Sequence, residues 1–122
     1  MYQIIEIGPC DGVDLLSLPG REIALDTMFA LLGTSCAAMQ HTPRLELLVW
    51  IDLDGLERDR EANARACGML RAVFGAPHAA VCGPLLVTGG SWRSPTALDK
   101  SEAADAFAYL FGAAPLGHPE RA

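Results

Sequence analysis

Two carboxylates at the end of a strongly apolar segment are the first residues here that could do chemistry. Asp52 and Asp54 stand two residues apart, so in an extended chain their side chains share a face. Such a pair can bind a divalent metal when a third oxygen ligand, here Glu57 or Asp59, completes the set. The simpler interpretation, a solvated strand end that enters a turn at Gly55, is favoured.

Glycines and arginines offer a second chemistry, the binding of an anionic nucleotide. The residues that would form this site are Gly89, Gly90, Ser91, Arg65, Arg71 and Arg93. Backbone amides and guanidinium groups together can hold a phosphate. However, the glycines match neither G-x-x-x-x-G-K-[ST] nor G-x-G-x-x-G, and no helix starts directly after them. Turn formation explains the glycines more simply. Four arginines, Arg58, Arg60, Arg65 and Arg71, fall within one short segment, and ion pairs with neighbouring acids on a solvated helix are the simpler account of them.

Nucleophilic catalysis lacks its usual signatures. The G-x-S-x-G elbow is missing, and Cys82 and His78 lie in an apolar-rich stretch where a structural thiol is the default. Cys10, Cys36 and Cys67 are spaced too irregularly for a zinc site or a C-x-x-C redox pair. We therefore expect no catalytic residue, no metal and no cofactor, and four reduced thiols in a cytoplasmic protein.

The two tryptophans are the best candidates for contact with a partner protein. Trp92 falls in the loop after Ser91, and Trp50 shares a strand face with Glu46 and Asp52. Large aromatic side chains on a loop or a wet face often anchor interfaces. For Trp50, burial in a second, smaller core is an equally good interpretation.

The composition indicates an acidic globular domain. The 122 residues are 51% hydrophobic and 20% charged, with a net charge of −6. This excludes intrinsic disorder, and it argues against nucleic acid or an anionic membrane as a partner, since both need clustered Lys and Arg. Solubility is the simplest role of the negative charge; a basic partner protein and mimicry of nucleic acid are the alternatives. The apolar stretch 23–39 contains Asp26 and is helical in period, so we do not expect it to span a membrane.

Hydrophobic periodicity predicts the elements that would position these residues. Strands are expected at residues 2–7, 13–18, 35–42, 45–53 and 81–88. Helices are expected from residue 22 to a stop at Gly33, along an apolar stripe at 62–74, and at 99–111 behind an Asp99–Glu102 capping box. The strand at 81–88 contains Gly83-Pro84, which predicts a sheet edge or a bulge.

Together these elements predict a single α/β domain of the α+β type at residues 1–112, followed by a loose tail at 113–122. About five strands would form a mixed, mostly antiparallel sheet, with about three helices packed on one face. The strand at 45–53 would have one well-buried side and one partly wet side.

Four segments occur in a recognisable order: an acidic strand and turn at 45–55, the motif at 61–66, the glycine-containing strand at 81–90, and the helix at 98–111. The second holds Asn63, Arg65 and Ala66, and the third runs into Val87-Thr88-Gly89. In this order they resemble a family of small proteins from phages, plasmids and integrative elements, known as domain of unknown function 3846. The resemblance implies a mixed α/β fold and an accessory role on a mobile element, and it carries over no catalytic residue.

The sequence thus predicts a non-enzymatic accessory protein of a phage or mobile element. It would bind a host or defence protein, and an anti-defence or inhibitor role is one form of this function. The protein could act as a homodimer. The alternative is a module that binds or sequesters a small anionic ligand, a nucleotide, through its arginines and the Gly89-Gly90-Ser91 loop.

Overall fold

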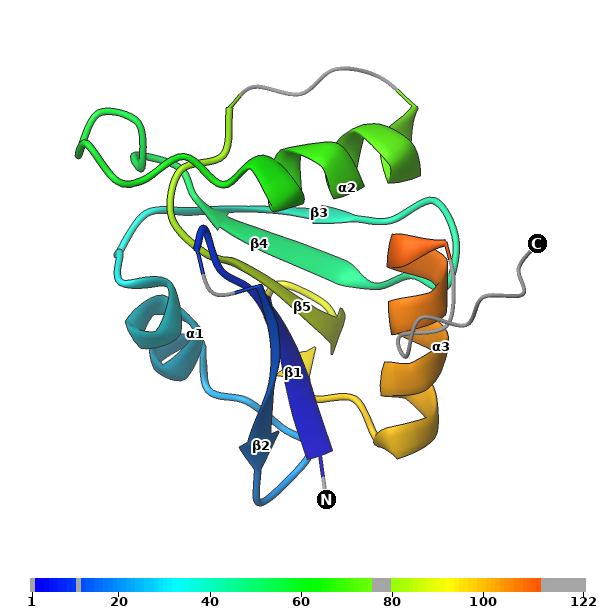
Figure 1. Ribbon diagram of the computed structural model, residues 1–122. Coiled ribbons are helices and arrows are strands. Elements are labelled where there is room, and N and C mark those ends of the chain that lie inside the picture. Colours follow the sequence, from blue (N-terminus) through cyan, green and yellow to red (C-terminus); the bar gives the residue numbers. More distant parts are fainter. Residues whose placement is uncertain (1, 11, 76–79, 113–122) are drawn as a thin grey trace.

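An antiparallel sheet forms the centre of the structure, a computed structural model that describes residues 2–10, 12–75 and 80–112 (Figure 1). In chain order the elements are β1 (Tyr2–Ile7), β2 (Val13–Leu18), α1 (Leu25–Leu32), β3 (Ala37–His41), β4 (Leu48–Asp52), α2 (Ala64–Phe74), β5 (Leu85–Gly90), β6 (Pro95–Thr96) and α3 (Lys100–Phe111). The strands lie in the order β2-β1-β5-β4-β3, and β6 pairs with β5. Every pairing is antiparallel, which confirms the predicted single α+β domain. The predicted tail at 113–122 lies outside the described residues.

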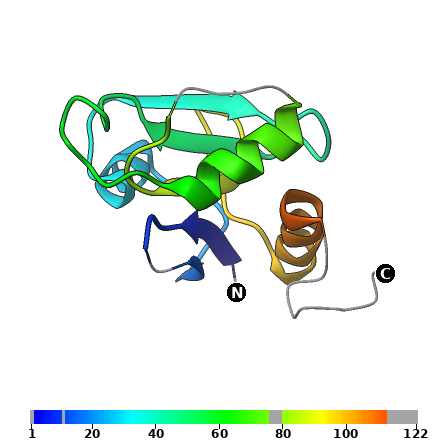
Figure 2. The ribbon, with the colours of Figure 1, turned by 45° about the horizontal axis from the view of Figure 1, so that its top comes forward.

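Helices cover both faces of this sheet (Figure 2). One buried cluster joins α2 and α3 to residues such as Val49 and Val87, and a second joins α1 to Leu48, Trp50 and Leu86. The prediction that all helices share one face is therefore wrong for α1, and the partly wet side expected for β4 is buried beneath it. The physical reason is that apolar residues follow one another without alternation at 47–51, so both faces of the strand need cover.

The strand predicted to contain the Gly-Pro pair is central, not at an edge. β5 begins at Leu85, directly after Pro84, and it lies between β1 and β4. The proline therefore takes no place in the ladder, and the predicted edge or bulge is wrong. Gly83, with φ +91°, instead makes the turn that leads into the strand.

The helix ends follow the local signals closely, with one exception. Gly33 ends α1 in the left-handed conformation, and Asp99 and Glu102 form the predicted capping box of α3. α2, however, begins only at Ala64, and residues 53–59 form turns instead of a solvated helical turn. Asp59 has φ +60°, which no right-handed helix permits. None of the helices in the described ranges is long and apolar enough to cross a membrane.

Candidate functional site

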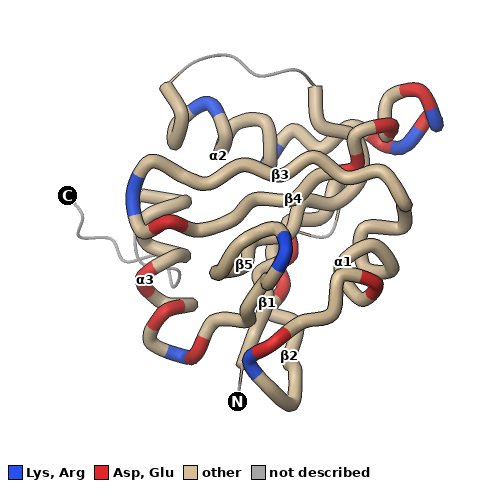
Figure 3. Tube along the Cα trace, turned by 180° about the vertical axis from the view of Figure 1, so that it is seen from behind, with Lys and Arg blue, Asp and Glu red and all other residues tan. Residues whose placement is uncertain are grey.

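The connection between β4 and α2, which we name the 53–60 loop, exposes apolar and charged side chains together. Leu53 is 59% exposed and Leu56 is 68% exposed. Glu57 and Asp59 are also exposed, and charges of both signs alternate along the loop (Figure 3). The loop therefore presents two exposed leucines among charged neighbours, which makes it a candidate contact surface.

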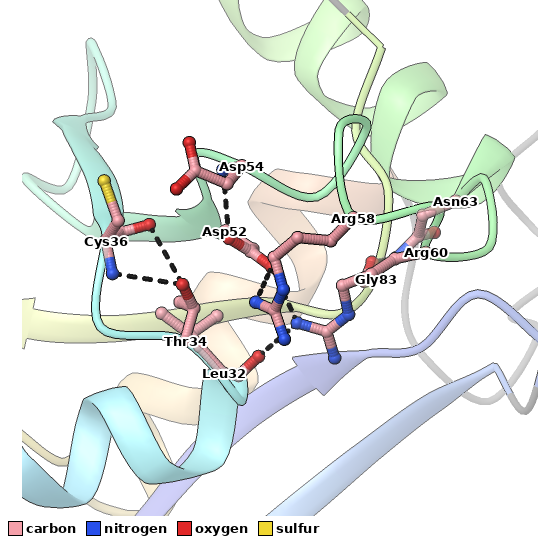
Figure 4. A network of polar contacts seen from close by, with 9 residues as sticks. All are labelled: Leu32, Thr34, Cys36, Asp52, Asp54, Arg58, Arg60, Asn63 and Gly83. Atoms are coloured by element: carbon pink, nitrogen blue, oxygen red, sulfur yellow. Dashed lines mark hydrogen bonds and ion pairs between the residues drawn. The ribbon is translucent and has the colours of Figure 1, made fainter.

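The buried carboxylate of Asp52, at the end of β4, holds this loop in place. The side chain of Asp52 is 0% exposed, and its Oδ2 accepts hydrogen bonds of 2.8 Å from Nη1 of Arg58 and of 2.8 Å from Nη1 of Arg60. Its Oδ1 accepts the backbone N–H of Asp54 at 3.0 Å (Figure 4). The last residue of β4 therefore holds both ends of the loop through one carboxylate.

Arg60 extends the anchor to two other elements. Its Nη1 also donates to the carbonyl of Leu32, the last residue of α1, at 2.6 Å. The guanidinium lies in a slot between two glycines: a Cβ on Gly83 would lie 2.9 Å from its Nε, and one on Gly33 would lie 3.2 Å from its Nη2. A Cβ at either position would crowd the guanidinium, and the left-handed backbone of both residues, with φ of +73° at Gly33 and +91° at Gly83, also favours glycine.

The loop backbone is packed as closely as its side chains. Gly55 donates to the carbonyl of Asp52 at 3.2 Å and accepts from the amide of Arg60 at 3.0 Å, so the loop closes on itself. A Cβ on Gly55 would collide with the carbonyl oxygen of Cys82. The left-handed backbone of Asp59 costs about 1 kcal/mol, and the anchor offsets this strain.

A buried asparagine determines where the loop ends and α2 begins. The Oδ1 of Asn63 accepts the amide of Ala66 at 3.0 Å, which caps the helix. Its Nδ2 donates to the carbonyls of Ile7 at 2.8 Å and of Gly83 at 2.9 Å. The same side chain therefore joins α2 to the end of β1 and to the turn before β5.

Asp52 is charged at neutral pH despite its burial. Burial alone would raise the pKa of this carboxyl, but hydrogen bonds from Arg60, the Asp54 amide and Thr34, and the charge of Arg58, lower it below its ordinary value. The anchor is therefore an ion cluster, in which one carboxylate faces two guanidinium groups.

The predicted turn at Gly55 is present, but these contacts correct the interpretation of Asp52 itself. Asp52 is not a solvated strand end, because it is buried, and its oxygens already face donors. No group of three metal-ligating side chains occurs in the described ranges. Sequence reasoning paired Arg58 and Arg60 with their neighbours in the chain, whereas both turn back to Asp52. The only local sign of this pairing is that the arginines follow Asp52 by six and eight residues, and such a spacing is a weak signal.

The glycines of the predicted nucleotide site are engaged in strand pairing. Gly89 and Gly90 belong to β5, opposite Thr96 and Pro95 of β6. The amide of Ser91 donates to the carbonyl of Ser94 at 3.2 Å and is not available to a phosphate. The glycines therefore belong to a hairpin, which confirms turn formation as the explanation of the glycine segment.

The hollow next to these glycines is acidic. Its volume is about 300 Å³, and its lining includes Glu46, Glu102 and Asp105. Arg21 also lines it, but its guanidinium pairs with Asp99 and with Glu102. An anion would meet three carboxylates here, so this hollow does not fit a nucleotide.

The predicted arginines lie apart from the glycines. Arg65 and Arg71 are exposed on α2, and Arg93 lies over the ring of Trp92, with its Cζ 4.8 Å from the ring centroid. Of these three, Arg65 lines a different hollow, between α2 and α3. None of the described cavities brings these arginines together with Gly89 and Gly90.

One of the two tryptophans is buried and the other is exposed. Trp50 is fully buried among the residues of the α1-side core, and its Nε1 donates to Oγ1 of Thr88 at 2.9 Å. Of the two interpretations left open, the core one therefore holds. Trp92 is half exposed in the β5–β6 turn and remains a candidate contact residue.

The four cysteines are free thiols that differ in burial. All four lie in the described ranges, and none forms a disulfide. Burial and the neighbouring Asp54 raise the pKa of the Cys36 thiol, which lowers its thiolate fraction. Cys82 is buried. His78, which the sequence offered as its partner, lies outside the described residues.

Thiol labelling of the native protein is expected to modify Cys10 first, because it is the most exposed of the four. Mass spectrometry after a short maleimide pulse should show one fast label on the peptide that contains Cys10, and four labels in urea. Cys82, which is buried, should label only after opening of the fold. Equal labelling rates for Cys10 and Cys82 would contradict the described burial.

No family model, curated protein or solved structure matches this chain. The arguments for function therefore rest on the geometry of the described residues.

Proposed function

We propose that the protein is a binding module that recognises another protein through the 53–60 loop. The observation that carries this proposal is the separation of roles within the loop. Asp52, Arg58 and Arg60 form the anchor, while Leu53 and Leu56 face solvent.

An anchored loop is well suited to binding because it is already ordered before the partner arrives. Association normally loses free energy when a flexible loop is fixed. Here the carboxylate of Asp52, the contact of Gly55 with Cys82 and the slot around Arg60 fix the loop in the unbound protein. Less of the favourable free energy of burying Leu53 and Leu56 would therefore be lost in ordering the loop on binding.

The charges of the loop indicate the chemistry of the partner. Arg58 and Arg60 direct their guanidinium groups to Asp52, whereas Glu57 and Asp59 have exposed side chains on the same loop. The side that faces solvent thus has an apolar part and a rim of acidic side chains, with the half-exposed Arg58 held toward Asp52. A complementary protein would offer an apolar pocket with Lys or Arg at its border.

The resemblance noted in the sequence suggests where such a partner would be found. We infer an accessory protein of a phage or mobile element whose partner is a host or defence protein, so that binding would inhibit or redirect it. The nucleotide alternative receives no support from the described geometry, because Gly89 and Gly90 pair with β6, the amide of Ser91 is hydrogen-bonded and the adjoining hollow is acidic.

Loss of the exposed leucines is expected to abolish capture of the partner. A tagged protein would be incubated with lysate of the cells that carry the gene, at low salt, and captured proteins identified by mass spectrometry. The double variant Leu53→Ser, Leu56→Ser should weaken binding of the captured protein at least about tenfold, because both apolar anchors are lost. The fold should be retained, since both side chains are exposed.

The matched control is Leu15→Ser, which removes an exposed leucine from β2. It should leave capture unchanged. Equal capture by wild type and the double variant would overturn the assignment to the loop. Recovery of no protein at low salt would overturn the binding function itself.

A further inference from the structure

The groove between α2 and α3 is a concave site, separate from the exposed 53–60 loop. It has a volume of about 600 Å³, within the usual range of small-molecule sites of about 300–1,000 Å³. Met69 and Val73 from α2 and Leu110 and Phe111 from α3 give it apolar walls. None of its lining residues belongs to the loop, so the two sites can be tested separately.

The α2 wall of the groove is built from small residues. Ala64, Gly68 and Ala72 recur every fourth position, so they lie on one face of the helix. A Cβ added at Gly68 would meet no described atom within 4 Å. Packing against the described chain therefore does not require glycine here, although glycine weakens a helix relative to alanine. Its effect is to keep the groove wide.

The polar residues of the groove are cationic. Arg44 and Arg65 line it, and no Asp or Glu does so among the described residues. Within the same ranges neither guanidinium takes part in an ion pair, although the chain has a net charge of −6 and only nine Lys and Arg. The hydroxyl of Tyr109 accepts the amide of Arg44 at 3.3 Å and keeps its own proton to donate.

From these features we propose that the α2–α3 groove binds an amphipathic carboxylate, a small molecule with an acidic head group and an apolar body. Apolar walls would bury the body of the ligand. The guanidinium groups of Arg44 and Arg65 supply the planar donor pairs that match a carboxylate, and the hydroxyl of Tyr109 adds a third donor. This assignment explains why two arginines that form no ion pair with the described residues border an apolar groove in an acidic protein.

The test is a calorimetric titration of the full-length protein with dodecanoate, kept below its micellar concentration. Binding is expected for dodecanoate and not for dodecyltrimethylammonium, which has the same apolar chain and the opposite charge. The double variant Arg44→Ala, Arg65→Ala should lower the affinity for dodecanoate at least about tenfold. Arg71→Ala, which removes an exposed cation from the same helix outside the groove, should bind like wild type.

A second variant tests the groove instead of its charge. Gly68→Trp should fill the open space beside α2 and prevent binding while circular dichroism stays unchanged. Should this variant fail to fold, the arginine variants decide alone. The proposal is overturned if dodecanoate does not bind, if the cation binds equally well, or if the double arginine variant keeps wild-type affinity.

Discussion

Replacement of Asp52 by alanine is expected to lower the free energy of unfolding by about 3 kcal/mol and to release the 53–60 loop. The change leaves Arg58 and Arg60 facing each other without a counter-charge. Arg60 is only 25% exposed and cannot fully reach water, whereas Arg58 is 46% exposed and can turn outward. The expected loss therefore lies at the lower end for a broken buried ion pair.

Urea unfolding would measure the stability of this variant, and hydrogen exchange would report the amides of Asp54 and Arg60, which the loop now protects. Glu57→Ala is the matched control, because it removes an exposed carboxylate from the same loop. It should change stability by less than about 0.5 kcal/mol. Equal stability of the two variants would show that the ion cluster does not hold the loop.

The same cluster gives the wild type a dependence on pH. Because the pKa of Asp52 is lowered in the folded state, its contribution is complete above the unfolded carboxyl value of about 3.9 and is lost as pH falls through the lower folded value. Stability should therefore fall below about pH 4 in the wild type. The isosteric Asp52→Asn variant should lack this part of the acid dependence.

Replacement of Asn63 by alanine is expected to destabilise the domain by about 3 kcal/mol. The loss combines the cap of α2, worth about 1 kcal/mol, with two buried hydrogen bonds to the carbonyls of Ile7 and Gly83, worth about 1 kcal/mol or more each. Thermal and urea unfolding would measure it.

Asn63→Ser separates the two roles of this side chain. Serine can accept the amide of Ala66 and cap the helix, but it is too short to reach both carbonyls. We expect it to recover only about 1 kcal/mol of the loss. Full recovery by serine would show that the bonds to Ile7 and Gly83 contribute nothing.

Much of the fold follows from short-range patterns in the sequence. Gly33 and the Asp99–Glu102 pair mark helix ends, and these signals act over only a few residues. The α+β class follows from the alternation of such segments. By contrast, α1 covers the opposite face from α2 and α3, and only the uninterrupted apolar run around Trp50 hints at two buried faces.

The candidate site depends on contacts that no local pattern contains. Arg60 meets a carbonyl 28 positions earlier in the chain and a glycine 23 positions later, so its role is decided only when α1 and the turn before β5 come together. Asp52 could be recognised as a strand end, but its burial requires those same elements. For this reason the acids and arginines could be listed from the sequence, whereas their pairing could not.

The division of labour within the 53–60 loop has a consequence for engineering. The positions that hold it, Asp52, Gly55, Arg58 and Arg60, differ from those that face outward, Leu53, Leu56, Glu57 and Asp59. Three of the outward positions have ordinary backbone conformations, and at the fourth, Asp59, asparagine or glycine suits the left-handed backbone. The loop can therefore be diversified as a display library, much as the tip of an antibody hypervariable loop is varied above a constant framework.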